Sequence, residues 1–186
     1  SEYWENGDLT WFSPTDLSKA NNLVLLDSTN KITEKGLAKS SAKLMQPNSF
    51  MMTSRATIGL FGIFNKPFAT NQGFINVTPH KKEDKYYLLF NFKFRVPEFY
   101  NHASGAIFPE ISKSNFKRLK IQWPSDELLV TWHNIVSPII DSISNLTEQN
   151  KRLKEARDIL LPRLMTGMIN VDHIELPIKE EGTEAA

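Results

Sequence analysis

Residues 125–161 read SDELLVTWHNIVSPIIDSISNLTEQNKRLKEARDILL. Apolar side chains recur in this stretch with the heptad spacing that is typical of a coiled-coil helix. The pattern predicts one long helix whose apolar stripe either pairs with another helix or packs on its own domain. The first seam position of the heptad holds Leu129, Val136, Ile143, Asn150 and Arg157, and the second holds Trp132, Ile139, Leu146, Leu153 and Leu160.

Residues that begin, bend or end helices lie along this stretch. Ser125 precedes two acidic residues, which is the arrangement of an N-cap in front of an acidic first turn. Pro138 should kink the helix or divide it into two, because proline lacks the amide hydrogen that a helix interior needs. We expect Pro162 to stop the helix and Gly167 to close a terminating turn.

The residues before this helix have a different pattern. Short apolar or alternating stretches separated by turn residues predict a mixed α/β domain over residues 1–124, so the fold class is α+β. A coiled-coil-forming helix with its terminating turn (125–171) and a disordered acidic tail (172–186) should follow. Residues 85–94 fit a buried helix or a strand, and we favour the helix; Ser112 is a candidate cap of a short helical turn. Strands are expected at Leu9–Phe12, Ser49–Arg55, Leu60–Phe64, Phe74–Val77 and Leu119–Trp123.

The composition excludes several kinds of chemistry. The chain has no cysteine, which removes disulfides, thiolate zinc sites and thiol nucleophiles and fits a reducing compartment, so we expect a cytoplasmic protein. Its apolar runs are too short to span a membrane, and no signal peptide is apparent. The four histidines lack metal-site spacing, and no nucleophile elbow or phosphate-binding loop occurs, so we expect neither catalytic residues nor a metal site. Glu83 and Lys85 have the acid-x-Lys spacing of some nucleases, but a solvated loop explains this charged run better.

Charge is unevenly distributed along the 186 residues. The net charge is +1 overall, but it is +6 over residues 1–124 and −5 over residues 125–186. Residues 31–120 alone carry a net charge of +10. A basic domain joined to an acidic extension suggests a polyanionic partner such as nucleic acid, although a solvated mixed surface would give the same counts.

Polar residues near the ends of the predicted strands could read DNA. Arg55 can bridge guanine O6 and N7, and Asn71 or Gln72 can bridge adenine N6 and N7. A purely structural role, such as Asn71 capping a turn, is equally compatible with the sequence. The full set of candidate DNA-binding residues is Lys35, Lys39, Lys43, Arg55, Thr57, Lys66, Asn71, Gln72, Lys113 and Lys117.

Four stretches, taken in order, carry a resemblance to a known family. They are YWENGDLTWFSPTDLS (3–18), the run 32–63 that begins ITEKGLAKSS together with FATNQGFINVTP (68–79), SGAIFPEISKSNFKRLKIQWP (104–124), and RLKEARDILLPRLMTGMINV (152–171). Together they resemble the specificity subunits of type I restriction-modification systems, over nearly the whole chain to about Val171. The resemblance implies one target-recognition domain, lacking its usual opening strand, followed by one helical spacer.

The resemblance also implies a function and a set of partners. Such subunits bind double-stranded DNA without catalysing a reaction and direct methylase and restriction subunits to a bipartite target. S-adenosylmethionine, ATP and magnesium would then be bound by those partner subunits, and this chain would bind no cofactor. Subunits of this family usually have two recognition domains, so this chain would pair through its helix with a copy of itself or with a second recognition half. The alternative is an interaction module that docks a methylase through its helix and hardly contacts DNA.

Overall fold

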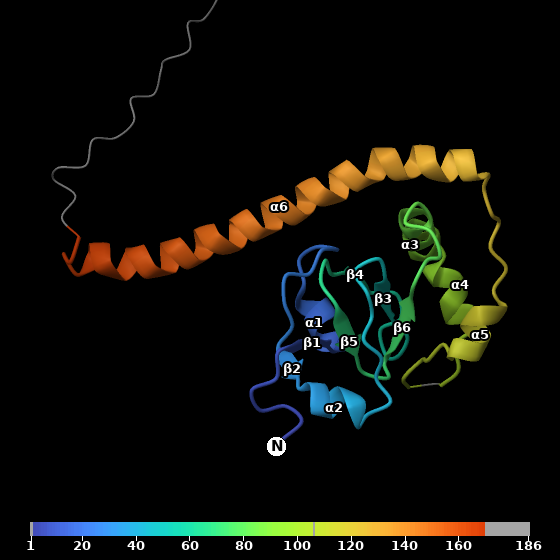
Figure 1. Ribbon diagram of the computed structural model, residues 1–186, viewed down its shortest axis with the longest axis horizontal. Coiled ribbons are helices and arrows are strands. Elements are labelled where there is room, and N and C mark those ends of the chain that lie inside the picture. Colours follow the sequence, from blue (N-terminus) through green and yellow to red (C-terminus); the bar gives the residue numbers. More distant parts are fainter. Residues whose placement is uncertain (1, 106, 170–186) are drawn as a thin grey trace, which may run out of the picture. The chain divides into compact units, whose positions relative to one another are not determined.

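The computed structural model describes residues 2–105 and 107–169, so the tail predicted at 172–186 lies outside the described residues. The described residues form six strands and six helices (Figure 1), which confirms a mixed α/β domain followed by a long helix. The strands are β1 (Leu9–Phe12), β2 (Asn30–Ile32), β3 (Phe50–Thr53), β4 (Phe61–Ile63), β5 (Phe68–Thr70) and β6 (Phe74–Val77). The helices are α1 (Pro14–Lys19), α2 (Glu34–Ala38), α3 (Asp84–Phe94), α4 (Val96–Asn101), α5 (Lys113–Arg118) and α6 (Asp126–Met165).

The strands form two three-stranded sheets. In the first sheet, β1 lies between the antiparallel β2 and the parallel β5. In the second sheet, β3 lies between β4 and β6, and both pairs are antiparallel. The strands predicted at 9–12 and 74–77 are confirmed in the same bounds, and those predicted at 49–55 and 60–64 are confirmed in shorter ones.

Two clusters of buried apolar side chains form the core, and the one around the first sheet also takes in Met51 and Phe74 of the second sheet. In this cluster, the ring of Phe12 on β1 makes edge-on contacts with Phe64, which follows β4, and with Phe68 on β5, at centroid distances of 5.2 and 6.0 Å. In the second sheet, Phe50 packs against Phe92 of α3 at 6.2 Å. Such pairs add roughly 0.5–1.5 kcal/mol beyond the area they bury, so the two sheets are firm frames for the loops that leave them.

The strand predicted at 119–123 is wrong. These residues form no regular structure, although Leu119 and Ile121 pack against the core beside the second sheet. The Tyr87 hydroxyl of α3 donates a hydrogen bond to the Gln122 carbonyl, so the segment runs along a helix. Burial against a helix produced an apolar alternation that resembles a strand.

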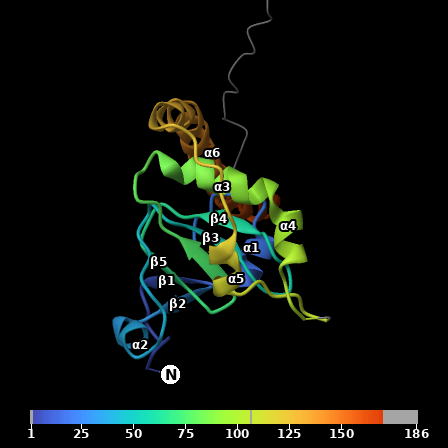
Figure 2. The same ribbon diagram turned by 90° about the vertical axis from the view of Figure 1, so that its right-hand side faces the viewer.

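Helix α3 confirms the helix favoured for residues 85–94, and the sides of α3 are covered by different elements. Leu89 and Phe92 pack in the core of the second sheet, and Tyr86 stacks on His133 of α6 at 5.4 Å. Figure 2 shows α3 between the sheet and the first turns of α6. This position explains why its sequence is apolar on nearly every side.

The solvated loop predicted around Glu83 and Lys85 is also wrong. Asp84 and Lys85 open α3 and are buried, with 5% and 7% of their surface exposed. The Lys85 ammonium donates a hydrogen bond to the Pro47 carbonyl at 2.8 Å. Lys85 therefore joins α3 to the loop before β3, and the Asp84 carboxylate accepts a hydrogen bond from the Lys81 amide at 3.2 Å.

Helix α6 contains two prolines. It is a single helix through Pro138 and Pro162, so of the two outcomes expected at Pro138, a kink or a division, the division does not occur, and the prediction that Pro162 stops the helix is wrong. Both prolines are exposed, and so are Asn134 and Asp158, whose carbonyls lose their amide donors and can be solvated. The predicted Ser125 cap is confirmed by a hydrogen bond from the Leu128 amide to the Ser125 hydroxyl at 3.3 Å.

The end of α6 has the predicted glycine turn. Gly167 has a φ of +69°, and its amide donates to the Leu164 carbonyl at 3.1 Å. The Met168 amide donates to the Arg163 carbonyl at 2.9 Å, which completes a Schellman motif. The helix therefore ends at Met165, a few residues after the predicted stop.

The chain divides at a different place from the predicted boundary at 124. One compact unit extends to Thr147, and the second begins at Glu148. The first turns of α6 belong to the first unit because Val136 and Ile140 are buried in its core. Two hydrogen bonds fasten them further, from Asn22 to the Thr147 hydroxyl at 3.0 Å and from Asn65 to the Ser144 hydroxyl at 3.1 Å.

Candidate functional site

A cleft of about 590 Å³ opens in the first unit and is lined by both sheets and by α5. It brings together five of the ten candidate DNA-binding residues, namely Lys43, Asn71, Gln72, Lys113 and Lys117. Among the lining residues that the structure describes there is no aspartate or glutamate. The lysine ammonium groups therefore make the cleft a favourable place for an anion.

Lys113 and Lys117 reach the cleft from successive turns of α5. The Ser112 hydroxyl caps this helix by accepting a hydrogen bond from the Asn115 amide at 3.1 Å, as predicted. Phe116, between the two lysines in the sequence, also lines the cleft and anchors the helix to the core, with ring centroids 4.9 Å from Phe92 and 5.4 Å from Phe99. A short helix would not hold two lysines in place alone, so this aromatic packing fixes their position.

The turn between β5 and β6 presents Asn71 and Gln72 at the cleft. The Asn71 side-chain oxygen accepts a hydrogen bond from the Gly73 amide at 3.0 Å, so Asn71 shapes this turn. Gln72, at the tip, is exposed. Asn71 therefore has the structural role that its sequence context allowed, and Gln72 has the more available side chain for a ligand.

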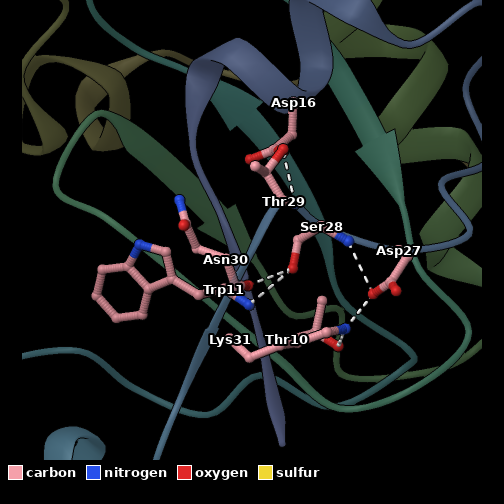
Figure 3. Close-up of polar contacts among 8 residues, drawn as sticks. All are labelled: Thr10, Trp11, Asp16, Asp27, Ser28, Thr29, Asn30 and Lys31. Atoms are coloured by element: carbon pink, nitrogen blue, oxygen red, sulfur yellow. Dashed lines mark hydrogen bonds and ion pairs between the residues drawn. The ribbon is translucent and has the colours of Figure 1, made fainter. Parts of the chain in front are cut away.

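Trp11 also lines the cleft, although it was not predicted as a site residue. Its backbone amide donates a hydrogen bond to the Ser28 hydroxyl at 3.2 Å, and that hydroxyl donates to the Asn30 carbonyl at 2.6 Å (Figure 3). Its indole packs edge-on against Trp4 at 5.2 Å. An aromatic residue inside a strand is typical of a core. Trp11 lines a cleft because the second sheet and α5 lie across from it, which the sequence does not show.

A second part of the same network fixes the loop before β2. The Thr29 amide and hydroxyl donate to the Asp16 carboxylate at 2.9 and 2.6 Å, and Lys31 contacts Asp27 and the Thr10 hydroxyl (Figure 3). Burial alone would raise the pKa of Asp16, but hydrogen bonds from Thr29 and Ser13 lower it overall. The carboxylate is thus held in its charged form, where it ties the loop to α1.

Asn76 and Thr70 form a polar pair on the cleft wall. The Asn76 amide nitrogen donates to the Thr70 hydroxyl at 2.8 Å, which joins the end of β5 to β6. Within the described residues, the Asn76 side-chain oxygen is buried without a hydrogen-bond partner. This pair was not predicted, because nothing in the sequence places the two strand ends side by side.

The other candidate DNA-binding residues lie outside the cleft lining. The Arg55 guanidinium is 3.8 Å from the Glu110 carboxylate, and Thr57 is exposed beside it. The Ser54 amide donates to the Gly73 carbonyl at 2.9 Å, so the backbone before Arg55 adjoins the turn that carries Gln72. Three exposed lysines are placed elsewhere on the first unit: Lys35, whose ammonium is 2.6 Å from a Glu2 oxygen, Lys39 at the end of α2, and Lys66.

The predicted coiled-coil residues divide into two groups. Val136 is buried and Ile143 is partly buried in the core of their own domain, which corrects the expectation that Val136 meets a partner helix. Asn150 is exposed. The second seam position stays open to solvent, with exposed fractions of 54% at Ile139, 57% at Leu146, 67% at Leu153 and 46% at Leu160.

The described residues contain neither a metal cluster nor a membrane span. No group of three or more His, Cys, Asp or Glu side chains is close enough there to hold a metal ion. No helix in the same part of the chain is both long and apolar enough to cross a bilayer.

Comparisons with known proteins give a consistent result. The family model for the type I restriction modification DNA specificity domain matches residues 1–155. The type I restriction enzyme MjaIX specificity subunit of Methanocaldococcus jannaschii is 33% identical over 156 residues, covering 83% of this chain and 36% of that protein. The HindI specificity subunit of Haemophilus influenzae is 29% identical over 154 residues, covering 80% of this chain and 33% of that protein.

The fold is also found among solved structures. The crystal structure of the type I restriction-modification S subunit from M. genitalium aligns with a TM-score of 0.61 at 16% identity, over 89% of this chain and 40% of that one. This chain thus spans about a third of the length of the two curated relatives.

Proposed function

The chain belongs to the type I restriction-modification DNA specificity domain family, and from this premise we propose that it recognises one half of a bipartite DNA target. It recognises the DNA sequence, and other subunits catalyse methylation and cleavage. The observation that carries the proposal is the cleft in which Lys43, Lys113 and Lys117 meet Asn71 and Gln72 without a carboxylate among the described lining residues.

Each group of side chains in and around the cleft has a distinct task. The lysines bind phosphates, which gives affinity and register but no choice of sequence. Gln72, and Arg55 on the neighbouring turn, read base edges in the major groove. The alternative of a docking module with little DNA contact is not favoured, because it leaves this cationic cleft without a role.

The partners follow from the family. Methylase subunits carry S-adenosylmethionine and modify adenine, and the restriction subunit uses ATP and magnesium for translocation and cleavage. This chain holds none of these cofactors. Its role is to bind one DNA sequence and thereby bring the methylase and restriction subunits to it.

Pairing with a partner helix joins this recognition domain to a second one, so that the two domains bind the two halves of the target. The exposed second seam position of α6 is the contact, and its members are spaced evenly on both sides of Leu146. An antiparallel copy whose two-fold axis passes at Leu146 would set Trp132 opposite Leu160 and Ile139 opposite Leu153. The partner is a second copy of this chain or a separate recognition half.

The test is to express the full chain with a type I methylase subunit, purify the complex and map the adenines that it methylates in DNA of many sequences. One methylated bipartite motif is expected, and a palindromic motif would identify self-pairing. A complex without motif-specific methylation would contradict the proposal.

Cleft variants make this test specific. Replacing Lys113 and Lys117 together by Ala should keep the complex and lose methylation of the motif. Lys66→Ala is the control, because Lys66 is also exposed but lies outside the cleft lining. If both variants behaved alike, the cleft would not be the DNA site.

A further inference from the structure

The loop between α4 and α5 exposes two adjacent large apolar side chains. Ile107 is 83% exposed and Phe108 is 63% exposed. Figure 2 shows this loop extending away from the two sheets. Single exposed apolar residues are ordinary, but neighbouring ones at a loop tip carry a cost in water that a ligand can relieve.

The base of this loop is anchored to the domain. Ser104 and Glu110 exchange both backbone hydrogen bonds, at 3.0 and 2.8 Å, and Glu110 also forms a bridge with Arg55. The Pro109 carbonyl accepts a hydrogen bond from the Ala56 amide at 2.9 Å. The tip is therefore presented by a short ladder of backbone bonds.

The backbone at both sides of this ladder is in an unusual conformation. Gly105 has a φ of +99°, and a Cβ there would lie 2.6 Å from the Phe108 carbonyl oxygen. Ala56, opposite, has a φ of +62° although it is not a glycine. Strained residues of this kind persist where the surroundings impose them, often at binding sites.

Residues at the base of the loop connect it to the cleft, although Arg55 there is 3.8 Å from the Glu110 carboxylate. Arg55 forms its backbone bridge at the base of the loop, and α5 with Lys113 and Lys117 begins a few residues after Phe108. Arg55 also follows Ser54, which is bonded to the turn that carries Gln72. A duplex bound along the cleft would meet the loop tip on the same path.

We propose that Ile107 and Phe108 form an apolar finger that packs against base edges and sugars in a groove of the bound duplex. This inference rests on the proposed function and adds residues that no basic or amide pattern identifies. Apolar side chains contact thymine methyl groups in the major groove and wedge against bases in the minor groove. The finger thus supplies apolar surface where the lysines supply charge.

Photo-crosslinking tests what covers the finger. We would replace Phe108 by p-benzoylphenylalanine in the full chain and irradiate it with a pool of short duplexes of randomised sequence, with and without the methylase subunit. Phe94 is the control position, because it is 89% exposed and lines a groove beside Leu128 and Pro124. Crosslinks to DNA from position 108 and not from position 94 support the proposal.

Other results overturn it. Crosslinks from position 108 to the methylase alone would make the loop a protein contact, and no crosslink would leave it without a partner. A direct binding assay with the unmodified chain distinguishes failure of the proposed function, because the chain would then bind none of the duplexes.

An affinity measurement gives a second readout. The double change Ile107→Ser and Phe108→Ser should weaken duplex binding about tenfold, because two apolar side chains no longer bury surface against the DNA. Phe94→Ser should leave the affinity unchanged. The urea midpoint should move in neither variant because all three side chains are exposed, and unchanged affinity in the double variant would overturn the proposal.

Discussion

Asn71 and Gly73 close the turn between β5 and β6 through a hydrogen bond of 3.0 Å from the Gly73 amide to the Asn71 side-chain oxygen. Asn71→Ala removes this acceptor and should lower the free energy of unfolding by about 1 kcal/mol. Urea unfolding measures the change. Asn71→Asp keeps an acceptor and should lose less, and a larger loss in the Asp variant would contradict this role.

Gln72→Ala and Arg55→Ala should change the choice of target. Each side chain is exposed, so we expect little change in stability. If either reads a base, discrimination at one position of the motif should fall by about 1–3 kcal/mol. Methylation mapping with the purified complex measures this. Equal weakening on all sequences would assign that residue to a phosphate or a scaffold role.

The salt dependence of DNA binding should show how many phosphates the cleft lysines neutralise. With Lys113 and Lys117 both changed to Ala, the slope of log K against log salt should become shallower by about 1.8, at roughly 0.9 for each phosphate that is no longer neutralised. Titrations at several salt concentrations give the slope. Lys35→Ala should leave it unchanged, because the Lys35 ammonium is paired with Glu2 outside the cleft. An unaltered slope in the double variant would place the phosphates elsewhere.

Two positions on α6 should separate folding from association. Val136→Ala leaves a cavity in the core and should destabilise the domain by about 1–3 kcal/mol without changing association. Leu146→Glu places a charge on the exposed seam and should abolish helix pairing while the domain keeps its stability. Sedimentation and urea unfolding measure the two effects. Retained association of the Leu146→Glu chain would remove the seam from the interface.

Lys85 should give the domain a distinctive pH profile. Burial lowers the pKa of Lys85 from 10.5 to about 8, against the opposing effect of Asp141. Between these two values the folded state releases its proton before the unfolded state does, so the free energy of unfolding rises with pH in that window. The gain is about 3 kcal/mol across the window.

The measurement is urea unfolding of the chain and of Lys85→Met from about pH 7 to about pH 11.5, a range that extends about one unit beyond each pKa. The variant should lack this rise because it has no group to titrate at the site. Parallel profiles for the two proteins would show that Lys85 keeps its ordinary pKa.

The parts of the fold that the sequence predicted are those with a strong local pattern. Helix α6 was predicted from its heptad pattern. Its cap at Ser125 and its turn at Gly167 were each predicted from a few neighbouring residues. The strands β2 and β5 were not predicted, since each has three residues and no alternation. The apparent strand at 119–123 was wrong because burial against α3 and burial in a sheet leave similar patterns.

The sequence predicted which residue types could bind DNA, but it did not predict which of those residues lie together in the cleft. Lysines and amides that can bind DNA are visible in any sequence, but only tertiary packing separates Lys113 and Lys117 in the cleft from Lys35 and Lys66 outside it. Trp11 was missed for the same reason. The loop finger at Ile107 and Phe108 had no signal, because exposure is a property of the folded chain.

The layer that α3 forms between the second sheet and the first turns of α6 has a mechanical consequence. Packed protein interiors are hardly compressible, so a push or pull on these turns passes through α3 without slack. It reaches β6, whose residues wall the cleft. A force applied to the first turns of α6 would therefore also deform the wall of the cleft.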